Sequence, residues 1–82
     1  MKKSISVVTL FPGASQFYAG QIRELFGDLV EVYSYSTSDR SVEKITRTDL
    51  YLVSTDAFKI AEEESQYVPA DGQVVDIYVG YS

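Results

Sequence analysis

The sequence contains no cysteine and no histidine. These two absences remove the residues that most often serve as thiolate nucleophiles, as general bases near neutral pH and as ligands for transition metals. The lack of cysteine also agrees with a reducing compartment. We therefore expect no enzymatic activity, no metal site and no cofactor, and we place the protein in the cytoplasm.

Positive charge and long apolar runs are also scarce. Seven Lys and Arg residues stand against 12 Asp and Glu residues, which gives a net charge of -5 at pH 7. Phosphate backbones and anionic lipid surfaces would repel such a domain as a whole. The apolar run from Ile5 to Phe11 is interrupted by polar residues and is too short for a signal sequence or a membrane span. We expect neither nucleic acid nor membrane as a partner.

The overall amino-acid composition is typical of a folded domain. The 82 residues are 45% hydrophobic and 23% charged, so residues 1–82 can form one domain with its own core. A chain of this size buries only about 60% of the surface that its unfolded form exposes. We expect modest stability.

Four segments have the character of β-strands. Residues 5–10 and 49–54 are nearly continuous apolar runs, which are typical of central parallel strands covered on both faces. Residues 29–35 and 73–79 alternate between apolar and polar side chains, as strands with one wetter face do. The segment 29–35 is predicted to be an edge strand.

A helix is predicted after the Pro12-Gly13 turn. Ser15 is expected to cap its first turn, and Gly27 is expected to end it in the left-handed conformation. Apolar residues recur at helical spacing and are expected to form its buried face, namely Tyr18, Ile22, Leu25, Phe26 and Leu29.

Helical structure is also predicted in both later connections. The polar segment 36–48 is expected to hold one or two helical turns, capped by Ser38 or Ser41. A helix is expected to begin at Asp56, with its buried side formed by Ala57, Phe58, Ile60 and Ala61. The run 62–64 of three glutamates then falls near the C-terminal end of that helix, where negative charge is mildly unfavourable.

Strands that alternate with helices predict an α/β fold with a mainly parallel sheet. The simplest strand order is 2-1-3-4, an incomplete three-layer arrangement that corresponds to half of a flavodoxin-like fold. The last two strands would lack a helix on the side of the first helix, with Tyr51, Val53 and Tyr78 as the residues that report on this bare face. We expect it to be covered in a homodimer or by missing domains of a longer protein.

Ligands of open α/β sheets gather beyond the carboxyl ends of the strands, where the strand order reverses. In this topology that point lies between the first and third strands. The candidate ligand-binding residues are Thr9, Phe11, Gly13, Ser15, Ser54, Thr55 and Asp56. Free amides at the helix start could bind the phosphate or carboxylate of a small anionic metabolite. The alternative is a plain turn, since one proline and one glycine fall short of a phosphate-binding loop.

Two related protein classes lack their key residues here. Asp56 resembles the phosphoacceptor of response-regulator receiver domains, but those domains also need acidic residues after the first strand and a lysine after a fifth strand. Small phosphotransfer subunits of sugar-uptake systems share the strand order but carry a cysteine where this chain has Leu10 and Phe11. We interpret Asp56 as a helix-capping residue.

The segments "ISVVTL", "FYAGQIRELFG", "LVEVYSYS" and "VEKITRTDLYLVST" together resemble the N-terminal sensory region of sigma-54-dependent bacterial transcriptional activators of the propionate-regulator type. The resemblance covers residues 5–79 as an overall pattern. It implies a regulatory or sensor domain that binds a small ligand or relays a signal to ATPase and DNA-binding domains. Two alternatives stay open, a phosphocarrier-like domain without its nucleophile and an interaction module that uses its seven tyrosines.

Overall fold

The computed structural model describes residues 2–55, 57–58, 61–69 and 71–77. Its elements are β1 (Lys3–Thr9), α1 (Pro12–Phe26), the 3-10 turn η1 (Gly27–Leu29), β2 (Val30–Ser36), the 3-10 turn η2 (Ser41–Lys44), β3 (Leu50–Ser54), α2 (Ala61–Tyr67) and β4 (Val74–Ile77). The strands form a parallel sheet in the order β2-β1-β3-β4. The predicted fold class and strand order are therefore confirmed.

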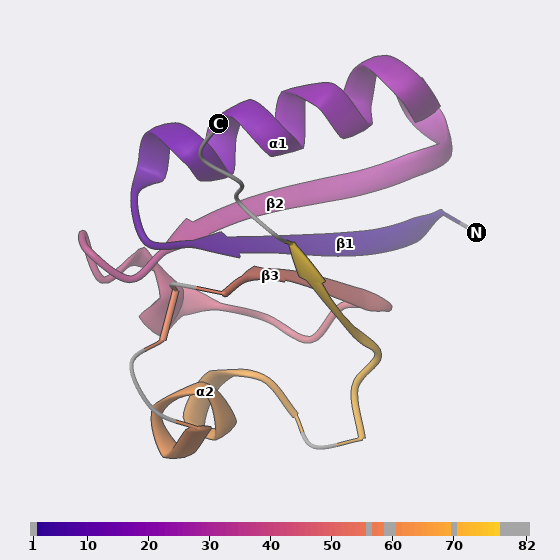
Figure 1. Ribbon diagram of the computed structural model, residues 1–82. Coiled ribbons are helices and arrows are strands. Elements are labelled where there is room, and N and C mark those ends of the chain that lie inside the picture. Colours follow the sequence, from indigo (N-terminus) through magenta and orange to yellow (C-terminus); the bar gives the residue numbers. More distant parts are fainter. Residues whose placement is uncertain (1, 56, 59–60, 70, 78–82) are drawn as a thin grey trace.

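The sheet is covered on both faces near its centre. Figure 1 shows α1 on one side of the sheet and α2 on the opposite side. Every residue from Ile5 to Thr9 in β1 is buried, which agrees with the central strand that the nearly continuous apolar run predicted. The core on the α1 side is formed by Ile5, Val7, Ala19 and Val32, and the core on the α2 side by Val8, Val42, Tyr51, Val53, Ala57 and Val68.

A strip of the sheet over β3 and β4 has less cover on the α1 side. We call the side chains Leu50, Leu52 and Val75 the open strip; Leu52 and Val75 are neighbours in the register of β3 and β4. Leu50 and Leu52 are half-buried, and Val75 is 47% exposed. The prediction that Tyr51 and Val53 lie on this bare face is wrong, and Tyr78 lies outside the described residues. Tyr51 and Val53 point to the other face because side chains alternate along a strand, and they are buried there.

Helix α1 begins four residues earlier than a cap at Ser15 would place it. Phe11 is the N-cap residue, with no side-chain capping bond, and Pro12 occupies the first turn. Proline suits this position because its fixed φ is helical and its missing N–H has no partner to lose. The prediction that Ser15 caps the helix is wrong, since Ser15 lies buried inside the first turn.

The buried face of α1 is narrower than predicted. The buried residues are the small Ser15 and Ala19, flanked by Tyr18 and Ile22, which pack against the core on this side. Three predicted core residues are exposed instead, namely Leu25 at 77%, Phe26 at 48% and Leu29 at 73%. Gly27 ends the helix with a positive φ of 56°, at the predicted position, but its ψ of -128° differs from that of the left-handed helical conformation; its N–H donates to the Arg23 carbonyl.

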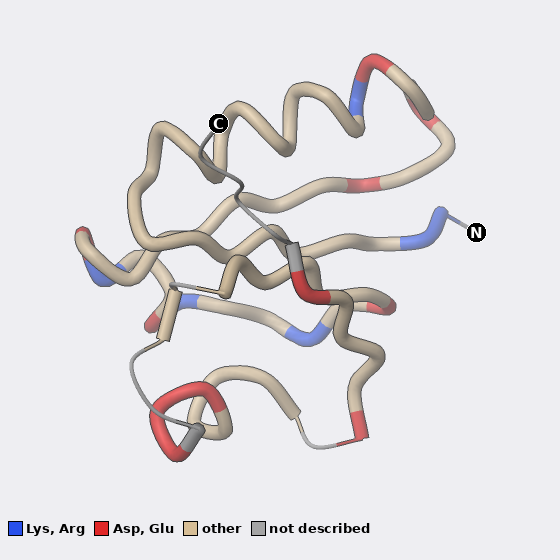
Figure 2. Tube along the Cα trace, viewed as in Figure 1, with Lys and Arg blue, Asp and Glu red and all other residues tan. Residues whose placement is uncertain are grey.

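The second helix, by contrast, begins later than predicted. Ala57 is buried and Phe58 is half-buried, but neither is helical, and α2 spans Ala61–Tyr67. Asp56 and Ile60 lie outside the described residues. The three glutamates 62–64 therefore occupy the first turn of α2, where the helix dipole favours negative charge, so their predicted C-terminal placement was wrong. Figure 2 shows this acidic turn.

The polar connection between β2 and β3 contains the predicted helical turn. It is the 3-10 turn η2, which has no side-chain cap from Ser38 or Ser41. Arg40 precedes it in the left-handed conformation, with φ 63°. Ser41 instead bonds backward to the end of β2, and this contact shapes the candidate site.

Candidate functional site

The carboxyl ends of β1 and β3 lie side by side, as the predicted topology requires. Val8 pairs with Val53, so Thr9 and Ser54 are neighbours at the ends of their strands. Both residues are buried, with Thr9 1% exposed and Ser54 3% exposed. This is the edge at which open α/β sheets bind their ligands.

Two hydroxyl groups connect β1 to the first turn of α1. The Thr9 and Ser15 hydroxyl oxygens are 2.5 Å apart. Thr9 Oγ1 donates to the Phe11 carbonyl at 2.6 Å, and Ser15 Oγ donates to the Tyr35 carbonyl. Each hydroxyl has one proton, so the two groups can donate in only two of these three contacts at a time, and both side chains are used in holding β1, α1 and β2 together.

The other predicted residues are dispersed around this pair. Phe11 is 60% exposed and Gly13 is exposed, both at the start of α1. Thr55 is exposed after β3, and the Ser54 carbonyl accepts the Ala57 N–H at 3.1 Å. Asp56 lies outside the described residues. The six described members of the predicted set thus lie at one edge of the sheet, and the hydrogen bonds above link Thr9, Phe11 and Ser15.

A polar hollow of about 180 Å³ opens beside α1 on the β2 side. It is lined by Pro12, Ser15, Gln16, Ser34, Tyr35, Ser36, Asp39 and Ser41. Of the predicted residues that the structure describes, Ser15 alone lines it. The hollow therefore lies next to β2 rather than between β1 and β3, because the first turn of α1 leans over the end of β2.

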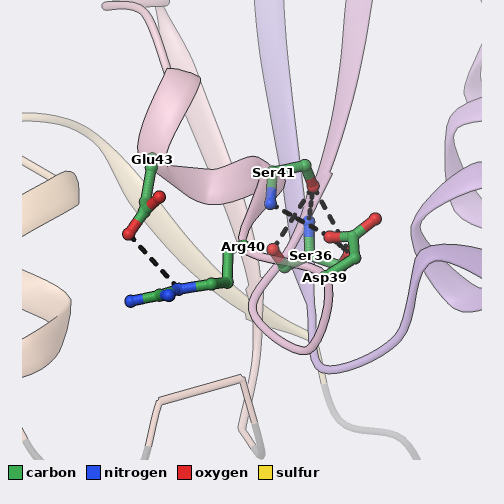
Figure 3. A network of polar contacts seen from close by, with 5 residues as sticks. All are labelled: Ser36, Asp39, Arg40, Ser41 and Glu43. Carbon is green, nitrogen blue, oxygen red and sulfur yellow. Dashed lines mark hydrogen bonds and ion pairs between the residues drawn. The ribbon is translucent and has the colours of Figure 1, made fainter.

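Asp39 organises the β2 side of this hollow. Figure 3 shows its carboxylate accepting hydrogen bonds from the Ser36 hydroxyl and, at 3.0 Å, from the Ser41 N–H. These bonds favour the charged form, and the Ser36 hydroxyl is the main reason that the pKa of Asp39 lies below its usual value. The carboxylate is therefore ionised at neutral pH.

Sequence reasoning did not select Asp39, Ser36 or Ser41. A signal was available, because an aspartate whose side chain can bond a backbone N–H two residues later is typical of a turn. The Asp39 bond to the Ser41 N–H has this spacing. Nothing in the sequence, however, indicated that this turn would fold back beside the first turn of α1.

The hydroxyl groups at this edge are used in contacts within the protein. With no histidine or cysteine in the sequence, the hydroxyl groups have no usual activating base, and the Ser15 oxygen is bonded to two protein oxygens. Within the described ranges, no group of three or more acidic residues is arranged to hold a metal ion. None of the helices in that part of the chain is long and apolar enough to cross a membrane.

Comparison with known proteins adds no relative: no family model matches the chain, and neither a curated protein nor a solved structure matches it.

Proposed function

We propose that this chain is a non-catalytic regulatory module, the sensory part of a bacterial transcriptional regulator of the sigma-54-dependent type, and that it binds a small polar molecule in the hollow beside α1. The observation that carries the proposal is the hollow itself, with its hydroxyl, amide and carboxylate lining at the ligand-binding edge of an α/β sheet. The sequence resemblance supplies the regulatory context.

The lining favours a neutral, hydroxyl-bearing ligand over an anion. Gln16, Ser34 and Asp39 offer amide, hydroxyl and carboxylate groups that can each bond a ligand hydroxyl. The amides of Gly13 and Ala14 lie in the first turn of α1, where a helix leaves N–H groups without a helical partner. These amides would attract an anion, but the charge of Asp39 across the hollow opposes it.

A thermal melting screen tests this proposal. A library of small hydroxylated metabolites is added to the wild-type protein and to Ser34→Phe, which fills the hollow from the edge strand. A ligand at 100 times its dissociation constant stabilises the native state by about 2.7 kcal/mol. For a domain of this size each kcal/mol raises the melting temperature by about 4–8 °C.

The screen includes a matched control. Ser38→Phe places the same ring on the exposed loop that follows β2, outside the lining of the hollow. Ligands that stabilise the wild type and Ser38→Phe, but not Ser34→Phe, support binding in the hollow. If the library leaves the melting temperature of the wild type unchanged, or if Ser34→Phe responds like the wild type, the proposed site is wrong.

A second candidate function is docking through the open strip. Leu25 projects from the flank of α1 two turns after Tyr18, and Tyr18 packs in the same cluster as Leu50 and Leu52. Figure 2 shows that α1 carries few charges along its length. This combination favours a protein contact, either with a second copy or with further domains of a regulator. Sedimentation velocity across a concentration series tests for the second copy, and a single monomeric species throughout would argue against it.

A further inference from the structure

The outer edge of β2 has no neighbouring strand among the described residues, and side chains bond its backbone instead. β2 is the first strand in the order β2-β1-β3-β4, so β1 is its neighbour on one side only. In a parallel strand, alternate residues direct their N–H and C=O groups toward the same neighbour. The Thr37 N–H donates to the Thr9 carbonyl of β1, at 3.0 Å. Val30, Val32, Ser34 and Ser36 therefore direct their backbone groups away from β1, to the open side.

Two side chains bond this outward row, one near its beginning and one at its end. Arg23 reaches over from α1, and its Nη2 donates to the Val32 carbonyl at 2.9 Å. At the other end, the Ser36 N–H donates to Ser41 Oγ at 2.8 Å, and the same hydroxyl lies 3.3 Å from the Ser36 carbonyl. The Asp39 carboxylate holds the Ser41 N–H in place (Figure 3). The backbone groups of Val30 and Ser34 and the Val32 N–H have no bond described on this side.

We propose that Arg23 and Ser41 guard the β2 edge against the addition of another strand, including β2 of a second copy. An exposed strand edge is a template for pairing with another chain. A strand that pairs along the whole of β2 would have to bond Val30, Val32, Ser34 and Ser36 in succession, and three of those eight groups are already taken. The two guards leave Ser34 fully available between them and Val30 before them, and a single residue is too short a stretch for a stable ladder.

The guards come from opposite directions in the sequence, which makes them independent. Arg23 lies in the last turns of α1, before β2, whereas Ser41 follows β2 and opens η2. Arg23 is exposed, and its guanidinium has a defined acceptor without an ion pair to a described carboxylate. Removing its bond to the Val32 carbonyl therefore tests the edge-blocking role without breaking an ion pair between described residues.

The test compares Arg23→Met/Ser41→Ala with the wild type by hydrogen exchange and sedimentation velocity, each across a range of protein concentrations. Methionine keeps the aliphatic stem of arginine and removes its donors. We expect at least tenfold tighter self-association in the double variant, with the amides of Val32 and Ser34 becoming protected as concentration rises. The matched control is Arg47→Met/Ser38→Ala, which makes the same chemical changes away from the β2 edge and should associate like the wild type.

Two results would overturn the proposal. One is a double variant that gives the native amide spectrum but shows the same concentration dependence as the wild type. The other needs no variant: if the Val32 and Ser34 amides of the wild type become protected with rising concentration, strands already join the guarded edge. This second measurement keeps the proposal testable even if the double variant does not fold.

Discussion

Asp49 shows how a single exposed residue can couple this fold to pH. Its carboxylate accepts hydrogen bonds from the Ser4 N–H at 2.8 Å and from the Ser4 hydroxyl at 3.2 Å. The backbone bond from Ser4 is the largest cause that holds the pKa of Asp49 below its usual value. The contact joins the beginnings of β1 and β3, at the opposite end of the sheet from the hollow.

We expect this contact to make stability fall in acid. Because the native pKa of Asp49 is lowered, the unfolded state binds the proton more tightly, so the stabilisation is complete above the unfolded pKa of about 4 and is lost as pH falls through the native pKa. Urea unfolding of the wild type and Asp49→Asn should therefore differ above pH about 5 and converge at lower pH. A carbon-detected titration of Asp49 with a midpoint at or above that of an unfolded aspartate would contradict this.

At the scale of elements, the packing of β3 depends on the loop that precedes β4. Gly72 lies against the ring of Tyr51, a fully buried side chain whose hydroxyl accepts the Thr48 N–H at 3.1 Å. A Cβ on Gly72 would stand 3.1 Å from Tyr51 Cε2 and 3.1 Å from the Pro69 carbonyl oxygen. The loop can approach the strand this closely because residue 72 has no side chain.

Gly72→Ala should therefore destabilise the protein, by about 1–3 kcal/mol in urea unfolding, since a buried ring or the backbone must move. Gly20→Ala is the matched control: a Cβ at Gly20 meets no atom within 4 Å, and Gly20 lies inside α1. That substitution should stabilise the protein by about 0.5–1 kcal/mol. Equal effects of the two substitutions would show that the close approach at Gly72 is not rigid.

The strands could be predicted from sequence, and the beginnings of the helices could not. Apolar runs and alternation depend on burial, which the sheet provides, so β1 to β4 appeared where expected. Ser15 was misread because serine is favoured at a helix N-cap. The helix instead begins at Pro12, whose fixed φ suits the first helical position, and the Ser15 hydroxyl is used in a buried contact with Thr9. The start of α2 was misread because Ala57 and Phe58 are apolar in a non-helical segment.

The site was partly predictable for a related reason. Topology predicts which strand ends meet, and Thr9, Ser15 and Ser54 do lie at the carboxyl edge. The hollow, however, depends on the loop after β2, where Asp39 bonds Ser36 and Ser41. Local hydrogen bonds of this kind leave no periodic pattern in a sequence, so strand and helix signals did not reveal it.

At the scale of the whole molecule, the α1 side of the sheet is well covered over β1 and less covered over β3 and β4. Val75 of the open strip is 47% exposed, whereas Val7 in the core under α1 is fully buried. The same substitution should therefore have different effects at the two positions. Val75→Thr should change the free energy of unfolding by no more than about 0.5 kcal/mol, as surface substitutions do.

Val7→Thr is the matched control and should cost about 1–3 kcal/mol, because it places a hydroxyl in an apolar core. Urea unfolding at low protein concentration measures both. If Val75→Thr proves as costly as Val7→Thr, the open strip is buried in solution and its description as an exposed surface is wrong.

The central claim is that the Thr9 and Ser15 hydroxyls hold the fold together, so that binding falls to the hollow beside them. Urea unfolding of Ser15→Ala tests it most directly. Loss of the hydroxyl leaves buried partners unsatisfied at a cost of about 1–3 kcal/mol, and the better helix propensity of alanine returns about 0.5 kcal/mol. We therefore expect the variant to be less stable than the wild type. A Ser15→Ala protein as stable as the wild type, or more stable, would contradict the claim, because it would mark Ser15 as a residue kept for function at the expense of stability.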